Sequence, residues 1–177
     1  MRGMNGNRKN GHGDGSLLAD AVKGAIAGAV GVWAMDKVTW WLWDREDPRA
    51  LQREREARPG GMDPAHVIAN RAAEAMGTEL TPRQPHPAGS GVHYGLGIMP
   101  GAAYAVLRKR MPAVAAGGGL LYGLAMTLVE DEGLAPALGL AGSPTDYPWQ
   151  AHARGLVGHL VLGTVTHATL SALDSVA

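Results

Sequence analysis

The chain has 177 residues, a length that favours one domain with a sizeable core. Lysine plus arginine and aspartate plus glutamate both number 16, so the net charge is zero and the basic footprint of a nucleic-acid-binding protein is missing. The lack of cysteine excludes disulfides, thiolate metal sites and cysteine nucleophiles. The 26 glycines suit close helix packing in a bilayer, whereas the mean hydropathy of −0.07 is low for a membrane protein.

The N-terminal residues 1–15 are mostly Gly, Asn, Arg, Lys and His, a composition that predicts a disordered tail. We expect a single membrane domain over residues 16–177. It begins with an apolar helix whose first span covers about residues 18–43. Lys23 and Asp36 interrupt the apolar run, which favours a retained anchor over a cleavable signal peptide.

The first span carries features typical of a helix packed inside a bilayer. Trp40, Trp41 and Trp43 indicate an aromatic belt at one membrane interface. Small residues four positions apart let helix backbones approach closely, so we expect packing faces toward a homo-oligomer or a larger membrane complex. The predicted packing positions, in this span and in the third, are Gly24, Gly28, Gly31, Gly119 and Gly123.

A polar extramembrane loop follows, at about residues 44–90. Asp47 before Pro48 and Asp63 before Pro64 predict the N-caps of two short surface helices. The second helix has an apolar face that we expect to rest on the membrane surface or on the bundle. Its members are Ala65, Ile68, Ala72, Ala75 and Met76. We interpret two histidines of the loop as solvated, namely His66 and His86.

Three more spans complete the predicted all-α, four-span transmembrane helix bundle, at about residues 91–108, 113–131 and 148–173. Pro100 is expected to kink the second span unless neighbours satisfy the freed carbonyl. The apolar segment 135–140 is too short to cross a bilayer and predicts a turn or a shallow re-entrant piece.

The basic residues predict the orientation in the membrane. They precede the first span and fill the short link between the second and third, which the positive-inside rule places in the cytoplasm. We therefore expect a protein of the bacterial inner membrane with both termini cytoplasmic and an outward-facing acidic turn. The residues used are Arg2, Arg8, Lys9, Lys23, Arg108, Lys109 and Arg110.

Polar residues of the spans then fall near one depth in the outer leaflet. From the helical rise, Asp36 lies roughly 8 to 10 Å inside the Trp belt of the first span and His159 about 10 Å below His152, so the two could meet at similar depth. Other polar side chains are expected to rim this focus. The predicted polar focus is Asp36, His93, Glu130, Asp131, Glu132, His152, Arg154 and His159.

Several roles stay open for this focus. Imidazole titrates near neutral pH and intramembrane Asp/His chains relay protons, which indicates a proton-linked or pH-responsive site. Metal or haem binding through His93, His152 or His159 is a weaker alternative, since no familiar metal motif is present. The third alternative is that these side chains only hydrogen-bond across helices. Glu130 to Glu132 are either a solvated helix end or partners of Arg154.

Four segments resemble the YagU-like family of small bacterial inner-membrane proteins. They are Gly28 to Asp36, Val92 to Gly97, Asp131 to Gly142 and Tyr147 to Leu160. The most specific part is an acid followed by Pro-Ala-Leu-Gly-Leu and then His-x-Arg-Gly-Leu-x-x-His-Leu. The resemblance implies a multi-pass inner-membrane protein and no settled activity or catalytic residue.

The expected function is therefore that of a non-enzymatic membrane protein, an accessory or assembly subunit that packs through its small-residue helix faces. The proton-linked module and the metal- or haem-binding protein are the alternatives. No catalytic residue is assigned, the cofactor is unknown, and the expected partners are the lipid bilayer and other membrane subunits. A soluble helical domain would be recognised by carbonate extraction.

Overall fold

The computed structural model describes residues 11–80 and 85–176, and all regular structure in these ranges is helical. The long helices are α1 (Gly11–Trp43), α4 (Pro87–Arg110) and α7 (Trp149–Ser175). The shorter helices are α2 (Pro48–Ala57), α3 (Pro64–Ala75), α5 (Leu120–Met126) and α6 (Ala135–Ala137). Single turns and irregular helix form η1 (Pro59–Gly61), η2 (Pro112–Ala115), the π-helix η3 (Thr127–Leu134) and η4 (Pro144–Asp146).

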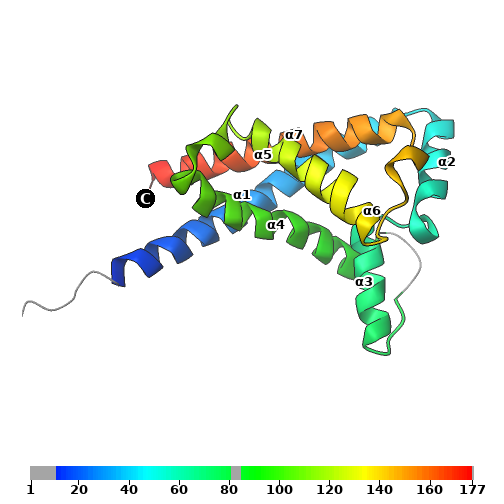
Figure 1. The fold of residues 1–177 in the computed structure, drawn as a ribbon, viewed down its shortest axis with the longest axis horizontal. Coiled ribbons are helices and arrows are strands. Elements are labelled where there is room, and N and C mark those ends of the chain that lie inside the picture. The colour runs from blue at the N-terminus through cyan, green and yellow to red at the C-terminus, as the bar shows by residue number, and fades with distance from the viewer. Residues whose placement is uncertain (1–10, 81–84, 177) are drawn as a thin grey trace, which may run out of the picture.

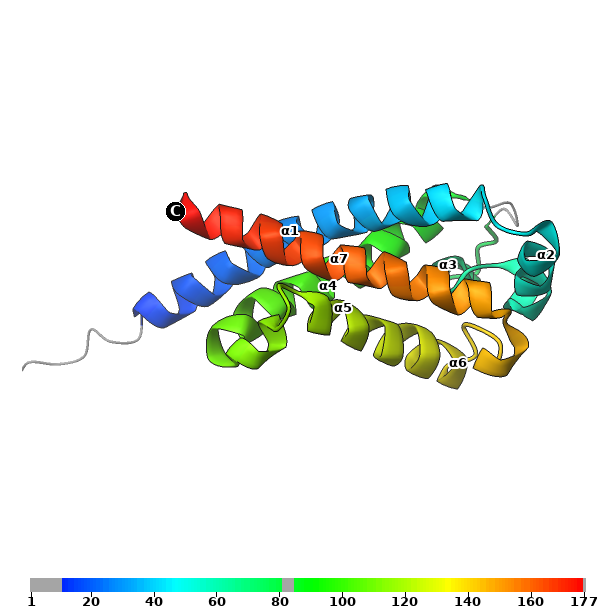
Figure 2. The ribbon, with the colours of Figure 1, turned by 90° about the horizontal axis from the view of Figure 1, so that it is seen from above.

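The long helices lie side by side along one axis (Figures 1 and 2). Helix α1 packs against both α4 and α7, α5 packs on α7, and α3 packs against α4. The start of α1, the end of α7 and the α4–α5 link lie at one end of the molecule, and α2 and α3 lie at the other. The predicted all-α class is confirmed over the described ranges.

Two helices are long and apolar enough to cross a membrane, Leu17–Trp43 and Trp149–Ser175, in the part of the chain that the structure describes. Only 33% of each apolar window is buried, whereas the core helix of a soluble protein is mostly buried. These two helices indicate a membrane protein, and they coincide with the predicted first and fourth spans.

The predicted packing glycines all lie at helix contacts within the chain. A methyl group on Gly28 would meet the carbonyl oxygen of Gly97 in α4 at 2.6 Å, and one on Gly31 would meet that of Leu162 in α7 at 2.9 Å. Similar contacts join Gly24 to α4, and Gly119 and Gly123 to α7. The small-residue faces thus hold α1, α4, α5 and α7 together, because side chains larger than hydrogen would separate their backbones.

The third predicted span differs from the structure at both of its ends. Helix α5 starts at Leu120 rather than near residue 113, because η2 is followed by three glycines with positive φ, Gly117 to Gly119. Such conformations are costly for other residues and interrupt a helix. The helix also continues through the acidic triplet as η3 and α6, so segment 135–140 begins as helix and turns only at Gly139.

The N-terminal prediction differs from the structure where the two can be compared. Helix α1 begins at Gly11, within the predicted disordered tail, and residues 1–10 lie outside the described residues. Helix α4 continues through Pro100 and spans residues 87–110, slightly more than predicted.

Both predicted N-caps of the polar loop are present. The Asp47 carboxylate accepts from the backbone N–H of Arg49 at 2.7 Å, and that of Asp63 accepts from the N–H of His66 at 3.0 Å. The buried face of α3 differs from the predicted one, since only Ala65 of that set is buried. Three others are exposed: Ala72, Ala75 and Met76. Helix α3 is rotated relative to the predicted orientation, because the His66 ring packs against Gly89 of α4.

Candidate functional site

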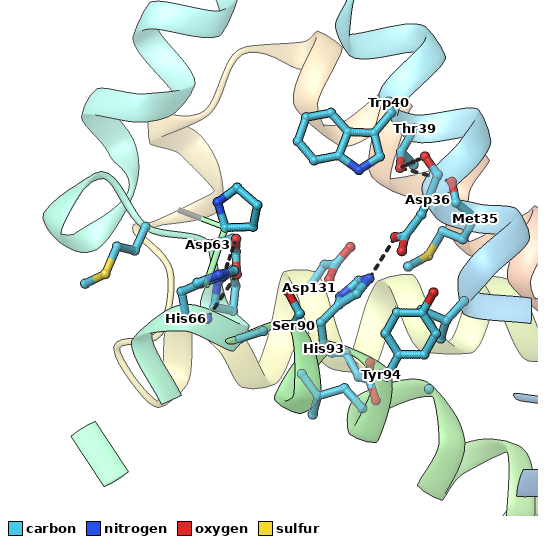
Figure 3. A pocket seen from close by; sticks show the side chains of 18 of the residues that line it. Met35, Asp36, Thr39, Trp40, Asp63, His66, Ser90, His93, Tyr94 and Asp131 are labelled. Atoms are coloured by element: carbon cyan, nitrogen blue, oxygen red, sulfur yellow. Dashed lines mark hydrogen bonds and ion pairs between the residues drawn. The ribbon is translucent and has the colours of Figure 1, made fainter. Parts of the chain in front are cut away.

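A cleft of about 840 Å³ lies at the α2–α3 end of the molecule, among α1, α4, η3, α7 and the loop before α3 (Figure 3). Six of the eight residues of the predicted polar focus line it: Asp36, His93, Glu130, Asp131, Arg154 and His159. The other two, Glu132 and His152, are not among its lining residues. The structure therefore brings most of the predicted focus into one cavity.

Asp36 pairs with His93 across the contact between α1 and α4. The Nε2 atom of His93 lies 2.8 Å from Oδ1 of Asp36, and both side chains are partly exposed, at 35% and 26%. Asp36 lies one turn beyond Val32 in α1, and His93 one turn before Gly97 in the antiparallel α4, where a methyl group on Gly97 would meet the Val32 side chain. The close packing of Val32 on Gly97 therefore brings Asp36 and His93 to the same level. The sequence analysis instead placed Asp36 opposite His159, and it placed His93 only on the rim of the polar focus.

His159 of α7 pairs with Asp131 of η3. Its Nδ1 atom lies 3.3 Å from Oδ2 of Asp131 and 3.1 Å from the backbone oxygen of Gly155. The imidazole is 11% exposed, whereas the carboxylate is 42% exposed and faces the cleft. Glu130 lines the same wall. Continuation of the helix through the acidic triplet is what brings Asp131 beside α7.

A third carboxylate–imidazole pair was not predicted. Nδ1 of His66 lies 2.8 Å from Oδ2 of Asp63, and its Nε2 accepts a hydrogen bond from the backbone N–H of His86 at 3.1 Å. Nδ1 therefore carries the proton and donates to the carboxylate. Nδ1 of His86 in turn accepts from the N–H of Gly89 at 3.1 Å.

The solvated interpretation of His66 and His86 was wrong, because these residues are only 5% and 4% exposed. Each histidine satisfies a backbone N–H near the start of α4, which gives a reason for its burial. A signal was present in the spacing, since Asp63 precedes His66 by three residues, as in a capping box.

Arg154 has partners other than the predicted acidic triplet. Its guanidinium forms ion pairs with Glu46 and Glu54, which the sequence assigned to the polar loop. Glu54 also pairs with Arg58 at 2.5 Å, and the guanidinium of Arg154 lies 4.7 Å from the ring centre of Trp43. This buried cluster fastens the loop and α2 to α7. The sequence analysis did not predict this cluster, because the charges of the loop nearly cancel and the loop was therefore interpreted as solvated.

Glu132 and His152 form a separate pair outside the cleft lining. Nδ1 of His152 lies 2.6 Å from Oε1 of Glu132, and its Nε2 lies 3.0 Å from the carbonyl oxygen of Pro144. The pair joins the end of η3 to the start of α7 and to η4. The predicted triplet is thus divided, with Glu130 and Asp131 facing the cleft and Glu132 bound to His152.

The predicted metal candidates lack a complete ligand set. Within residues 11–80 and 85–176, no group of three or more histidine or acidic side chains is arranged to hold a metal ion. His93, His152 and His159 each pair with one carboxylate, on three different elements. The geometry therefore lends no support to the metal alternative.

Over the described residues, the fold and the cleft define an all-α protein with two helices able to cross a membrane and a polar cavity at one end. Residues 73–168, more than half of the chain, match the family model described as "Protein of unknown function (DUF1440)". The chain belongs to this family, in agreement with the resemblance to an uncharacterised family. The comparison with curated proteins found no match, and neither did that with solved structures. The matched segment includes His93, Asp131 and His159, but it begins at residue 73 and so excludes Asp36 and Asp63.

Proposed function

We propose that this is a four-span protein of the bacterial inner membrane whose outward-facing cleft takes up and releases protons. Two observations support four spans. Helix α4 has 24 residues, and the helical run Leu120–Ala137 lies beside α7, so both accompany the two apolar helices along the bundle. The basic residues Lys23, Arg108 and Lys109 lie at the end that carries both described chain ends, which supports cytoplasmic termini.

The observation that carries the proton chemistry is the pair of Asp–His contacts in one cavity. Asp36–His93 and Asp131–His159 both line the cleft, and Glu130 lies on the same wall. An imidazole beside a carboxylate can gain or lose a proton near neutral pH while the hydrogen bond persists. Because ionisable groups in membrane helices are costly, such pairs commonly belong to proton pathways.

Proton flux into liposomes containing a pH-sensitive dye tests this function. We expect the full chain to accelerate dye acidification under an imposed proton gradient, and Asp36→Asn or His159→Gln to lower the flux at least tenfold. Asp44→Asn and His152→Gln are matched controls outside the cleft lining and should leave the flux unchanged. Equal flux in wild type, cleft variants and empty liposomes would remove the proposal.

A second candidate is an accessory or assembly subunit, the function first expected from the small-residue faces. Those faces are occupied within the chain, so the partner surface we propose is instead an exposed apolar stripe on α1. Its residues lie three or four apart: Leu18, Val22, Ile26, Val30 and Trp33. Such a stripe suits either lipid or a neighbouring helix.

Native gels in mild detergent distinguish these two uses of the stripe. If it binds a second copy or another subunit, Val22→Trp with Ile26→Trp should abolish the larger species and leave a folded monomer. The matched variant Leu124→Trp changes an exposed residue of α5, outside this stripe, and should retain the larger species. A wild-type protein that migrates as a monomer, or a complex that survives the double substitution, contradicts the assembly role.

A further inference from the structure

The cleft has aromatic walls in addition to its ionisable groups. Trp40, Trp43 and Tyr94 all line it. Trp40, near the end of the long helix α1, is 57% exposed. Figure 3 shows its indole ring beside the open space that separates Asp63 and His66 on one side from Asp36 and His93 on the other. An apolar ring with free access to a polar cavity is suited to contact a bound molecule.

Acidic side chains in the lining of the cleft outnumber the arginines that are not bound by glutamate. Two of its three arginines, Arg58 and Arg154, are bound by Glu46 and Glu54, so these four side chains together are neutral. Arg55, the third, is an exposed residue of α2 whose guanidinium lies 5.6 Å from the ring centre of Trp43. The lining also has four acidic side chains, two of which pair with the imidazoles of His93 and His159: Asp36, Asp63, Glu130 and Asp131.

The size of the cavity also suits a ligand larger than a water molecule or a hydrated ion. Small-molecule sites commonly have volumes of roughly 300 to 1,000 Å³ and combine apolar or aromatic walls with a few polar groups. The cleft, at about 840 Å³, lies within this range and has both components. The acidic side chains of the lining disfavour an anion and favour a cation.

We propose that the cleft binds an organic cation with an apolar body, such as a quaternary ammonium or phosphonium compound. Its charge lies between Asp36 and Asp63, and its apolar groups contact the faces of Trp40 and Tyr94. Cations over an indole ring gain electrostatic attraction, and the gain is larger when water is excluded. This inference deepens the proposed function by giving the same cleft a ligand class, but it does not depend on proton movement.

Two probes of equal shape and opposite charge test the inference. Equilibrium dialysis of the full chain in mild detergent would measure binding of tetraphenylphosphonium and, separately, of tetraphenylborate. We expect saturable binding of the cation at one site per chain, and only non-saturable micelle partitioning of the anion. Saturable binding of the anion with equal affinity, or no saturable binding of the cation, overturns the proposal.

Matched variants then locate the site. Asp36→Asn combined with Asp63→Asn should weaken cation binding at least tenfold, and asparagine at position 63 can still cap α3. Trp40→Leu should weaken binding at least threefold, whereas Trp41→Leu, an equally exposed neighbour outside the lining, should not. Unchanged helical circular dichroism excludes unfolding as the cause. Affinities that fall as much in Trp41→Leu as in Trp40→Leu overturn the assignment to the cleft.

Dialysis and liposome flux separate this inference from the proposed function. Proton flux that is sensitive to the cleft variants, without cation binding, overturns the ligand and leaves the proton function. Cation binding that requires Asp36 and Trp40, without proton flux, supports the ligand and overturns the proton function.

Discussion

Arg154 should be the most sensitive ionisable residue for the stability of the fold, and Arg154→Met tests this. The guanidinium is 9% exposed and lies between Glu46 and Glu54, whose side chains are 8% and 3% exposed. Removing one member of a buried ion pair costs roughly 3 to 5 kcal/mol, because the remaining charge loses its compensation. Methionine retains an apolar stem that can pack on Trp43.

The structure indicates which end of that range to expect. Glu54 keeps an ion pair with Arg58 after the substitution. Glu46 has one carboxylate oxygen that is buried without a hydrogen-bond partner among the described residues, so it becomes the uncompensated charge. One uncompensated carboxylate rather than two favours the lower end, about 3 kcal/mol of the free energy of unfolding.

Unfolding by sodium dodecyl sulfate in mixed micelles, followed by tryptophan fluorescence, measures this loss. Adding Glu46→Gln to Arg154→Met should recover at least half of it, since the buried charge is then removed. Arg53→Met, at an exposed position of α2, should change the free energy of unfolding by less than about 0.5 kcal/mol. A loss below about 1 kcal/mol for Arg154→Met, or no recovery with Glu46→Gln, would refute a buried ion cluster.

Three further predictions concern packing and hydrogen bonding, and the same unfolding assay measures each of them. Gly101→Ala places a methyl group 2.7 Å from the carbonyl oxygen of Gly24 and should cost about 1 to 3 kcal/mol, whereas Gly95→Ala, where the structure leaves open space, should be neutral or stabilising by up to about 1 kcal/mol. Equal effects of the two substitutions would contradict the close contact of α1 and α4. His66→Ala should cost roughly 1 to 3 kcal/mol, because it leaves a buried backbone N–H without its acceptor; no loss would indicate that water replaces the ring. Asp174→Asn should cost no more than about 1 kcal/mol, since its ion pairs are partly exposed, and a larger loss would show that they are effectively buried.

Much of the local structure follows from short-range signals in the sequence. The Asp-Pro pairs at residues 47 and 63 specify helix starts because a carboxylate cap and a proline at the first position act on neighbouring backbone groups alone. The apolar runs specify the two membrane-type helices for the same reason. The third predicted span was displaced because the three glycines before Leu120 were counted as helix, although positive φ is the conformation they favour.

Which side chains meet across the bundle is a different problem. The sequence selected Asp36, His93, Asp131 and His159 as one polar group, and the structure places all four in one cleft. It paired Asp36 with the wrong histidine because depth along a helix does not specify which neighbour a side chain faces. That choice depends on the rotation and register of α1 against α4, in which Val32 packs closely on Gly97.

The polar loop shows the limit of sequence reasoning most clearly. Nothing in the composition of residues 44–90 distinguishes Glu46 and Glu54, which are buried against Arg154, from the exposed Glu56. Whether a charged side chain is buried depends on whether an oppositely charged partner lies beside it in the fold. Here that partner is Arg154, which is 108 residues from Glu46 and 100 residues from Glu54 in the sequence.

The sequence by itself therefore determined the all-α class, the helix caps, the membrane character of two helices and the set of polar residues worth attention, since these depend on local composition and periodicity. Only the tertiary structure decided the three Asp–His pairs, the buried arginine cluster and the aromatic cleft that they surround. These features arise where helices distant in sequence come into contact, at distances of a few ångströms that hydropathy and spacing do not encode.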